Sequence, residues 1–273
     1  MKIGIAPILT SYSIDVADLA KRAEGLGFES LWLPDQPVLP VKTASNAPRL
    51  WGDAVDPLIA LARASLVTTT LMLGTAVIVV TERHPIALAK EAATLDAYSG
   101  GRLLLGIGTG SIEEEAAILG SDFPHRWTQA REAVLAMKAL WTNDESEFHG
   151  KYYDFPSVYC FPKPVRKPHP PVLLGGKAAN VFKRAVEYGD GWIPIGVTPE
   201  EVRAGRAELD RLATAAGRDP LTLEISVVGL KADGAMIEAY RQAGMARAIV
   251  SFPTAGKAES MAELEKIARE LLP

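Results

Sequence analysis

The residues Gly175, Gly176 and Lys177 combine several features of a phosphate-binding site. They end the apolar run VLLGG, which predicts a buried strand, and they stand just before a helix expected over residues 178–188. Two glycines expose backbone N–H groups, the start of a helix attracts negative charge, and a lysine adds a positive charge. The sequence therefore favours an anion site here. The alternative is an ordinary strand-to-helix turn with a solvated lysine.

A second glycine turn, formed by Gly108, Thr109 and Gly110, follows the apolar run RLLLGI. A dinucleotide fingerprint would need a glycine where Ser111 stands, and the three glutamates at 113–115 would repel a phosphate at the start of the next helix. We therefore expect no nicotinamide site of that kind. The glycines could serve tight turning, or they could let the backbone approach a flat ligand. Their position at the carboxyl end of a strand favours the second explanation.

Polar side chains follow two further strands. Asp35 and Gln36 end one strand, and Arg83 and His84 follow another. A single histidine before a proline is more often a helix-start residue than a catalyst, and the other three histidines lie away from the strand ends. We therefore expect no metal site, and neighbouring strand ends supply no nucleophile–histidine–acid arrangement. A site without an obvious acid–base pair suggests that a cofactor carries the chemistry.

The elements that must position these residues are clearest over residues 71–110. A strand over 71–80, a helix that begins at Pro85 and ends at the glycines 100–101, and a strand over the run RLLLGIGTG, residues 102–110, follow one another. Two buried strands joined by a helix form a unit with parallel strands. Ligands of parallel α/β folds bind outside the carboxyl ends of the strands. The polar and glycine clusters lie at that end, so we expect the site there.

Eight strand–helix alternations occur along the chain, with strands expected to begin near residues 2, 29, 71, 103, 172, 191, 222 and 247. This pattern predicts an α/β fold, a single (β/α)8 TIM-barrel domain over residues 1–273. A helix over 127–141 and a hairpin over 145–155 form an insertion between strands four and five. The proline-rich segment 36–56, which contains Trp51, lacks periodicity, and we expect it to form a lid or a substrate wall.

Composition excludes several classes of protein. A net charge of -4 gives no general attraction for nucleic acid or an anionic membrane. The only cysteine, Cys160, excludes an intramolecular disulfide framework and suits a reducing compartment. The amino terminus has no signal-peptide pattern, and the longest apolar run is about half of a membrane span. We expect a cytoplasmic protein with a small-molecule substrate, and the sequence leaves open whether it forms a homodimer.

Seven stretches follow one another along nearly the whole chain: LGTAVIVVTERHP, KEAATLDAYSGGRLLLGIGTG, EEEAAILG, RWTQAREAVLAMKALWT, EFHGKYYDF, PKPVRKPHPPVLLGG and YGDGWIP. In this order they resemble the luciferase-like monooxygenase superfamily. The resemblance is greatest to its deazaflavin branch, the coenzyme F420-dependent oxidoreductases. It implies a TIM barrel that binds F420, or alternatively FMN, at the carboxyl face, with the phosphate near the end of strand five.

The resemblance also implies the position of the cofactor ring. A non-prolyl cis peptide bond between Ala76 and Val77 would lie behind the ring, and the end of strand two and the GTG turn would line it. Together with the anion site, the expected cofactor-binding residues are Asp35, Gln36, Ala76, Val77, Gly108, Thr109, Gly110, Gly175, Gly176 and Lys177.

Two departures from the family pattern bear on the reaction. Many deazaflavin members carry histidine where Gln36 stands, and sugar-phosphate dehydrogenases of the branch carry glutamate where Ser111 stands. Glutamine cannot act as a general base. We therefore expect hydride transfer to an activated C=C or C=N bond of a small organic substrate rather than alcohol oxidation. The alternatives are an FMN-dependent monooxygenase that uses dioxygen and a non-catalytic deazaflavin-binding protein.

Overall fold

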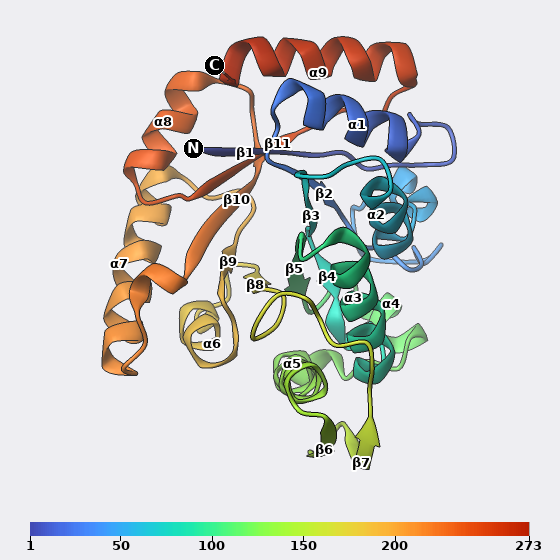
Figure 1. Ribbon diagram of the computed structural model, residues 1–273, viewed down its shortest axis with the longest axis vertical. Coiled ribbons are helices and arrows are strands. Elements are labelled where there is room, and N and C mark those ends of the chain that lie inside the picture. The colour runs from blue at the N-terminus through green and yellow to red at the C-terminus, as the bar shows by residue number, and fades with distance from the viewer. Residues whose placement is uncertain (273) are drawn as a thin grey trace.

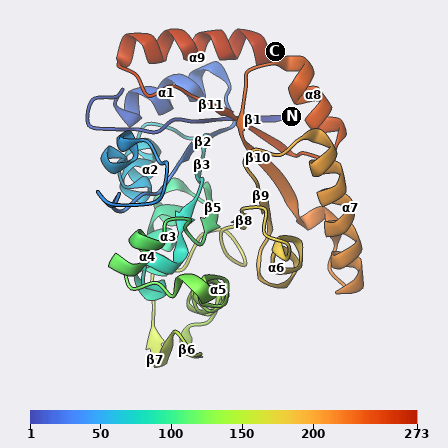
Figure 2. The same ribbon diagram turned by 180° about the vertical axis from the view of Figure 1, so that it is seen from behind.

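A ring of parallel strands forms the centre of the computed structural model, which describes residues 1–272, and helices surround the ring (Figures 1 and 2). The strands of the ring are β1 (Lys2–Ala6), β2 (Ser30–Leu33), β3 (Met72–Thr75), β4 (Ile78–Val79), β5 (Leu103–Gly108), β8 (Val172–Gly175), β9 (Gly191–Ile193), β10 (Glu224–Leu230) and β11 (Arg247–Ser251). Their order is β3-β2-β1-β11-β10-β9-β8-β5-β4, and a pairing of β3 with β5 closes the barrel.

The predicted (β/α)8 barrel is confirmed. Strands β3 and β4 are two halves of one position in the ring, because β3 pairs with β2 and β5 while β4 continues the pairing with β5. All eight expected strand starts fall at or within two residues of the observed ones. Buried apolar runs bounded by glycine or proline were therefore a sufficient signal for strands that are covered on both faces.

The helices outside the ring are α1 (Val16–Leu26), α2 (Pro57–Ser65), α3 (Pro85–Ser99), α4 (Glu113–Ile118), α5 (Arg126–Thr142), α6 (Val181–Tyr188), α7 (Pro199–Ala215), α8 (Gly234–Gln242) and α9 (Lys257–Leu271). The first and last of them, α1 and α9, lie side by side (Figures 1 and 2). The antiparallel hairpin of β6 (Glu145–His149) and β7 (Asp154–Tyr159) follows α5, as predicted for the insertion.

Local sequence signals fix where several helices begin. The Asp15 side chain accepts a hydrogen bond from the Ala17 amide at the start of α1, and Thr198 and Glu201 form a capping box at the start of α7. His84 caps α3, since its Nδ1 accepts from the Ile86 amide. The structure thus gives His84 the helix-start role rather than a catalytic one.

The apolar core has two parts. The larger part lies between the strands and the helices, and the smaller one fills the barrel interior with Trp32, Leu104, Leu173, Ile193 and Ile249. Trp32 fits because Gly74 stands on the neighbouring strand β3: a Cβ added there would lie 2.2 Å from the indole ring. Side chains alternate between the two faces of each strand, so the same strands supply both parts.

A buried arginine ties together the amino-terminal end of the barrel. Arg102 precedes β5, and its guanidinium donates hydrogen bonds to the Thr68 hydroxyl and to backbone carbonyls of the α2–β3 connection and of the end of α3: Ser65, Thr68, Leu71 and Ser99. These contacts satisfy carbonyls that the neighbouring helices and strands leave without partners. Arg102 therefore holds the scaffold at the end remote from the predicted site.

Within residues 1–272, none of the helices has the length and apolar character needed to cross a bilayer.

Candidate functional site

A pocket of about 560 Å³ opens at the carboxyl ends of the strands. Its lining includes all ten residues expected to bind a cofactor: Asp35, Gln36, Ala76, Val77, Gly108, Thr109, Gly110, Gly175, Gly176 and Lys177. Trp51, Ser45 and Ala47 from the segment 36–56 also line it, so this segment forms one side of the pocket, which we call the roof. The structure therefore brings the predicted residues together, and their binding of a cofactor remains a prediction.

A second cavity of about 550 Å³ lies at the opposite, amino-terminal end of the barrel. Most of its charged lining is internally neutralised: Lys2 pairs with Glu224, and Arg247 pairs with both Glu29 and Glu224. Side chains that satisfy one another in this way have an explanation within the fold. The carboxyl-end pocket, with the strand ends and the exposed backbone of glycine turns, is the better candidate for a functional site.

The peptide bond between Ala76 and Val77 is cis, which confirms the expectation drawn from the family resemblance. The bond lies where β3 gives way to β4, and both residues line the pocket. Val77 packs between two glycines: a Cβ on Gly108 would be 2.7 Å from Val77 Cγ2, and one on Gly175 would be 3.3 Å from Cγ1. These glycines are thus explained first by room for Val77, and this packing gives the pocket an apolar wall.

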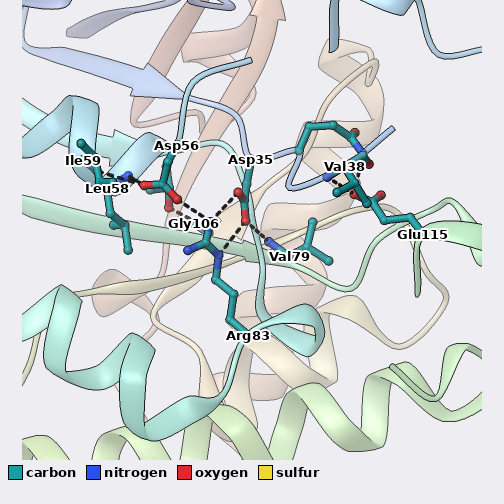
Figure 3. Close-up of polar contacts among 11 residues, drawn as sticks. Asp35, Val38, Asp56, Leu58, Ile59, Val79, Arg83, Gly106 and Glu115 are labelled. Carbon is teal, nitrogen blue, oxygen red and sulfur yellow. Dashed lines mark hydrogen bonds and ion pairs between the residues drawn. The ribbon is translucent and has the colours of Figure 1, made fainter. Parts of the chain in front are cut away.

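The carboxylate of Asp35, another lining residue, is fully engaged by hydrogen bonds (Figure 3). It accepts from Arg83 Nη2 at 2.7 Å, from Arg83 Nε at 3.1 Å and from the Val79 amide at 3.1 Å, and its side chain is 2% exposed. Arg83 also pairs with Asp56, which caps α2. Burial alone would lower the pKa of Arg83, but the two carboxylates outweigh it and raise the pKa. Asp35 and Arg83 therefore position β2, β4 and the roof.

Two glutamates of the short helix α4 hold the roof. Gln36 Nε2 donates to Glu115 Oε1 at 2.6 Å, and the Val38 amide also points to this oxygen (Figure 3). Glu114 accepts from the hydroxyl of Thr43 and from the Ala44 amide. The acidic start of α4, which the sequence suggested only as a source of repulsion, is thus the attachment point of the roof.

Glu115 is a pocket-lining residue that the sequence analysis did not single out. It is 2% exposed, and burial raises the pKa of its carboxyl. A signal was present, because Ile112, Glu115 and Ala116 have the spacing of one helical face and the two flanking residues are apolar. A glutamate on that face points inward.

Cationic groups gather beside Gly176. Lys177 Nζ donates to the Gly196 carbonyl and is otherwise exposed, and Arg126 lines the pocket with its guanidinium carbon 4.1 Å from the centre of the Phe123 ring. The Nε atom of Arg126 is buried and has no hydrogen-bond partner within residues 1–272. A buried donor without a partner at a pocket wall fits a ligand with a negative charge.

One detail of the expected anion site is corrected. Helix α6 begins at Val181, three residues later than expected, so Gly176 and Lys177 lie in a turn and not at a helix start. Gly176 has a φ of 88°, which directs the chain into this turn, and its carbonyl accepts from Trp192 Nε1. The predicted anion site therefore depends on Lys177 and Arg126 rather than on a helix terminus.

No group of three or more metal-ligating side chains occurs in the part of the chain that the structure describes.

The fold and the pocket define a (β/α)8 barrel protein with a candidate ligand pocket at the carboxyl ends of the strands. The sequence matches the luciferase-like monooxygenase family over residues 9–271, and the chain belongs to this family. An uncharacterized protein of Mycobacterium tuberculosis is 33% identical over 284 residues, which cover 99% of each chain. The F420-dependent glucose-6-phosphate dehydrogenase of Amycolatopsis mediterranei is 32% identical over 184 residues, which cover 66% of this chain and 52% of that protein.

Solved structures show the same barrel. The coenzyme F420-dependent tetrahydromethanopterin reductase of Methanopyrus kandleri has a TM-score of 0.79 at 18% identity, and it covers 100% of this chain and 99% of its own. The monooxygenase RslO1 of Streptomyces bottropensis has a TM-score of 0.80 at 21% identity with the same coverage. At these identities the similarity establishes the fold. The family resemblance seen in the sequence, including F420-dependent enzymes among the relatives, is confirmed.

Proposed function

We propose that the protein is an F420-dependent oxidoreductase that transfers a hydride between the deazaflavin and a small organic substrate. The observation that carries this proposal is the pocket itself, whose lining combines an apolar surface at Ala76 and Val77 with the cationic side chains of Arg126 and Lys177. A planar ring with an anionic tail suits a pocket with this lining. The F420-dependent relatives named above support the choice of cofactor.

Each part of the pocket would have a distinct task. Val77 and the turn from Gly108 to Gly110 would hold the ring, and Arg126 and Lys177 would hold its negatively charged tail. The bound cofactor supplies or accepts the hydride. The protein's residues orient the ring and, with Trp51 in the roof, exclude water from the exposed ring face.

The identity of residue 36, a glutamine, limits the reactions that the pocket could support. Its amide is committed to Glu115 and to the Val38 carbonyl, and an amide removes no proton from a substrate alcohol. We therefore infer a reduction of an activated C=C or C=N bond, which needs a proton donor instead of a base. Glucose 6-phosphate, the substrate of one relative, does not fit this chemistry.

Titration of the purified apoprotein with F420 and with FMN tests the cofactor. We expect F420 to bind and to show fluorescence quenching at concentrations where FMN does not. FMN could instead bind more tightly, with substrate turnover only in the presence of dioxygen. This result would establish the monooxygenase alternative, an activity for which the luciferase-like monooxygenase family and RslO1 are named. Binding of F420 without hydride transfer to any C=C or C=N acceptor would establish a cofactor-binding protein without catalysis.

Substitution of Lys177 with glutamate should weaken F420 binding by about 1–3 kcal/mol, because a charged hydrogen bond is replaced by a repelling carboxylate. Lys177 is exposed, so the thermal stability of the apoprotein should not change. The matched control is Lys183→Glu, which makes the same charge change at an exposed position on α6 outside the pocket lining. Equal affinity in Lys177→Glu and Lys183→Glu would place the anionic tail elsewhere.

A further inference from the structure

Glu115 combines a buried side chain with one oxygen that reaches the pocket. The residue is 2% exposed, and it belongs to the pocket lining. Its Oε2 atom accepts no hydrogen bond within residues 1–272, yet it is not among the partnerless polar atoms that solvent cannot reach. The accessible surface of Oε2 therefore belongs to the pocket. A carboxyl oxygen that the protein leaves unpaired at a pocket wall is available to a ligand.

The other oxygen of Glu115 is fixed by the roof. Oε1 accepts from Gln36 Nε2 at 2.6 Å, and the Val38 amide also points to it at 3.4 Å (Figure 3). The Gln36 amide is held in turn, because Nε2 also donates to the Val38 carbonyl at 2.7 Å. Since these donors are directed to Oε1, a proton carried by Glu115 belongs on Oε2, where it faces the pocket.

The other polar groups of the lining are poorer proton donors. Asp35 is the second carboxyl of the described lining, and both of its oxygens already accept hydrogen bonds from Arg83 or Val79. The serine and threonine hydroxyls of the lining are far weaker acids than a carboxyl. Lys177 is exposed and is assigned to the anionic tail of the cofactor. Glu115 therefore has the best combination of acidity and access to the ligand space.

Charged groups face Glu115 from several segments. Asp35 lies at the end of β2 and Glu82 in the segment before α3, and the negative charge of each disfavours a second charge nearby. Arg126 lines the same pocket from α5. On the same helix as Glu115, the Glu114 carboxylate turns to the roof.

The balance of these surroundings favours the protonated form of Glu115. Burial raises the pKa of its carboxyl, and the charge of Asp35 adds to this effect, whereas the hydrogen bonds from the roof oppose it. The 3-10 helix η3 (Phe123–His125) also packs against α4, but its His125 pairs with Asp122. The same hydrogen bonds from the roof would stabilise the carboxylate that remains after a proton has left.

We propose that Glu115 is the proton donor of the reduction and gives the proton on Oε2 to the substrate. This inference rests on the proposed function, since reduction of a C=C or C=N bond takes up one hydride and one proton. Reduced F420 supplies the hydride and is oxidised. The O–H bond of the carboxyl breaks as a C–H or N–H bond forms at the substrate atom next to the carbon that receives the hydride. After product release, the Glu115 carboxylate takes up a proton from the solvent that enters the pocket, and this proton needs no path through the protein because Oε2 lies on the pocket surface.

The first test compares two acceptors in the enzyme loaded with reduced F420. Cyclohexenone takes up a hydride and a proton, whereas an N-methylated cyclic iminium salt takes up a hydride alone. Glu115→Gln keeps an oxygen that can accept from Gln36 but has no acidic proton. Its maximal rate with cyclohexenone should fall at least about a hundredfold, and its maximal rate with the iminium salt should stay within about threefold of the wild type.

Two glutamates of the same helix provide the controls. Glu114 attaches the same roof but does not line the pocket, so Glu114→Gln should change the rates with both acceptors by the same factor. Glu113 is exposed, and Glu113→Gln should leave both rates unchanged. An equal loss with both acceptors in Glu115→Gln would show that Glu115 only positions the roof, and it would overturn the inference. Reduction of neither acceptor by the wild type would instead contradict the proposed function.

A titration of the apoprotein needs neither cofactor nor turnover. The difference between the infrared spectra of the wild type and Glu115→Gln isolates the C=O stretching band of the protonated Glu115 carboxyl. The midpoint of its loss with rising pH should lie above the ordinary value of 4.5. Because only the protonated form donates, the wild-type rate with cyclohexenone should fall as the pH rises through the same midpoint. A midpoint at or below 4.5 would overturn the inference, whether or not F420 binds.

Gln36→Met gives a second variant for this titration. The substitution removes a hydrogen bond that stabilises the Glu115 carboxylate, so the protonated-carboxyl band should persist to higher pH than in the wild type. Should Glu115→Gln fail to fold, the comparison of Gln36→Met with the wild type decides. Identical infrared titrations of these two proteins would overturn the inference.

Discussion

Replacing Arg83 with methionine is expected to lower the free energy of unfolding by about 3–5 kcal/mol and to weaken cofactor binding. The substitution leaves the carboxylate of Asp35, with a side chain 2% exposed, without its cation. The same carboxylate accepts from the Val79 amide, so its displacement disturbs β4 and the pocket wall beside Val77. Chemical denaturation and F420 titration of the variant measure the two effects.

The matched control combines Arg83→Met with Asp35→Asn. An asparagine oxygen can still accept from the Val79 amide, and the buried charge is gone, so the double variant should regain part of the lost stability. Asp56→Asn should cost less than Arg83→Met, because the Asp56 side chain is 34% exposed and Arg83 keeps its contacts with Asp35. A loss below about 1 kcal/mol in Arg83→Met, the value of a surface ion pair, would contradict the structural role of this cluster.

Arg102→Met should destabilise the protein by roughly 3–5 kcal/mol without altering the affinity for F420 in the protein that remains folded. The substitution keeps an apolar stem but removes the donors for the carbonyls of Ser65, Thr68, Leu71 and Ser99. The unfolding midpoint should fall by about 10 °C. Thermal unfolding and F420 titration below the transition measure the two quantities separately.

Arg102→Lys is the control for charge. A lysine keeps the positive charge but cannot reach carbonyls in several directions, so its stability should lie between those of the wild type and Arg102→Met. A loss of F420 affinity in either variant would show that the two ends of the barrel are coupled. It would contradict the purely structural role of Arg102 at the end remote from the pocket.

The barrel could be predicted from the sequence because its signals are local. Buried parallel strands are continuous apolar runs, and their helices begin with proline, aspartate or threonine and end near glycine. Topology then places all carboxyl ends on one face, which is why residues as distant as Asp35 and Lys177 could be assigned to one pocket. The cis bond at Ala76–Val77 came from family resemblance and not from local sequence preferences.

The polar contacts of the site could not be predicted in the same way. Arg83 pairs with Asp35 across 48 positions of sequence, and Gln36 meets Glu115 across 79. Neither pair has a local signal, since an arginine, a glutamine or a glutamate at the end of an element is ordinarily solvated. The inward position of Glu115 had a local signal in its helical spacing with Ile112 and Ala116, but its contact with Gln36 had none. The late start of α6 was missed because Ala178, Ala179 and Asn180 are compatible with a helix but form a turn, in which the Val181 amide donates to the Ala178 carbonyl.

The attachment of the roof to α4 has a mechanical consequence. Four hydrogen bonds join this six-residue helix to the segment that contains Gln36, Val38, Thr43 and Ala44. Because the helix is short and Glu114 and Glu115 are neighbours in it, the roof cannot be lifted as a whole without pulling on α4 or breaking these bonds. A ligand that displaced the roof would therefore also displace α4, the helix that carries the pocket-lining carboxyl of Glu115.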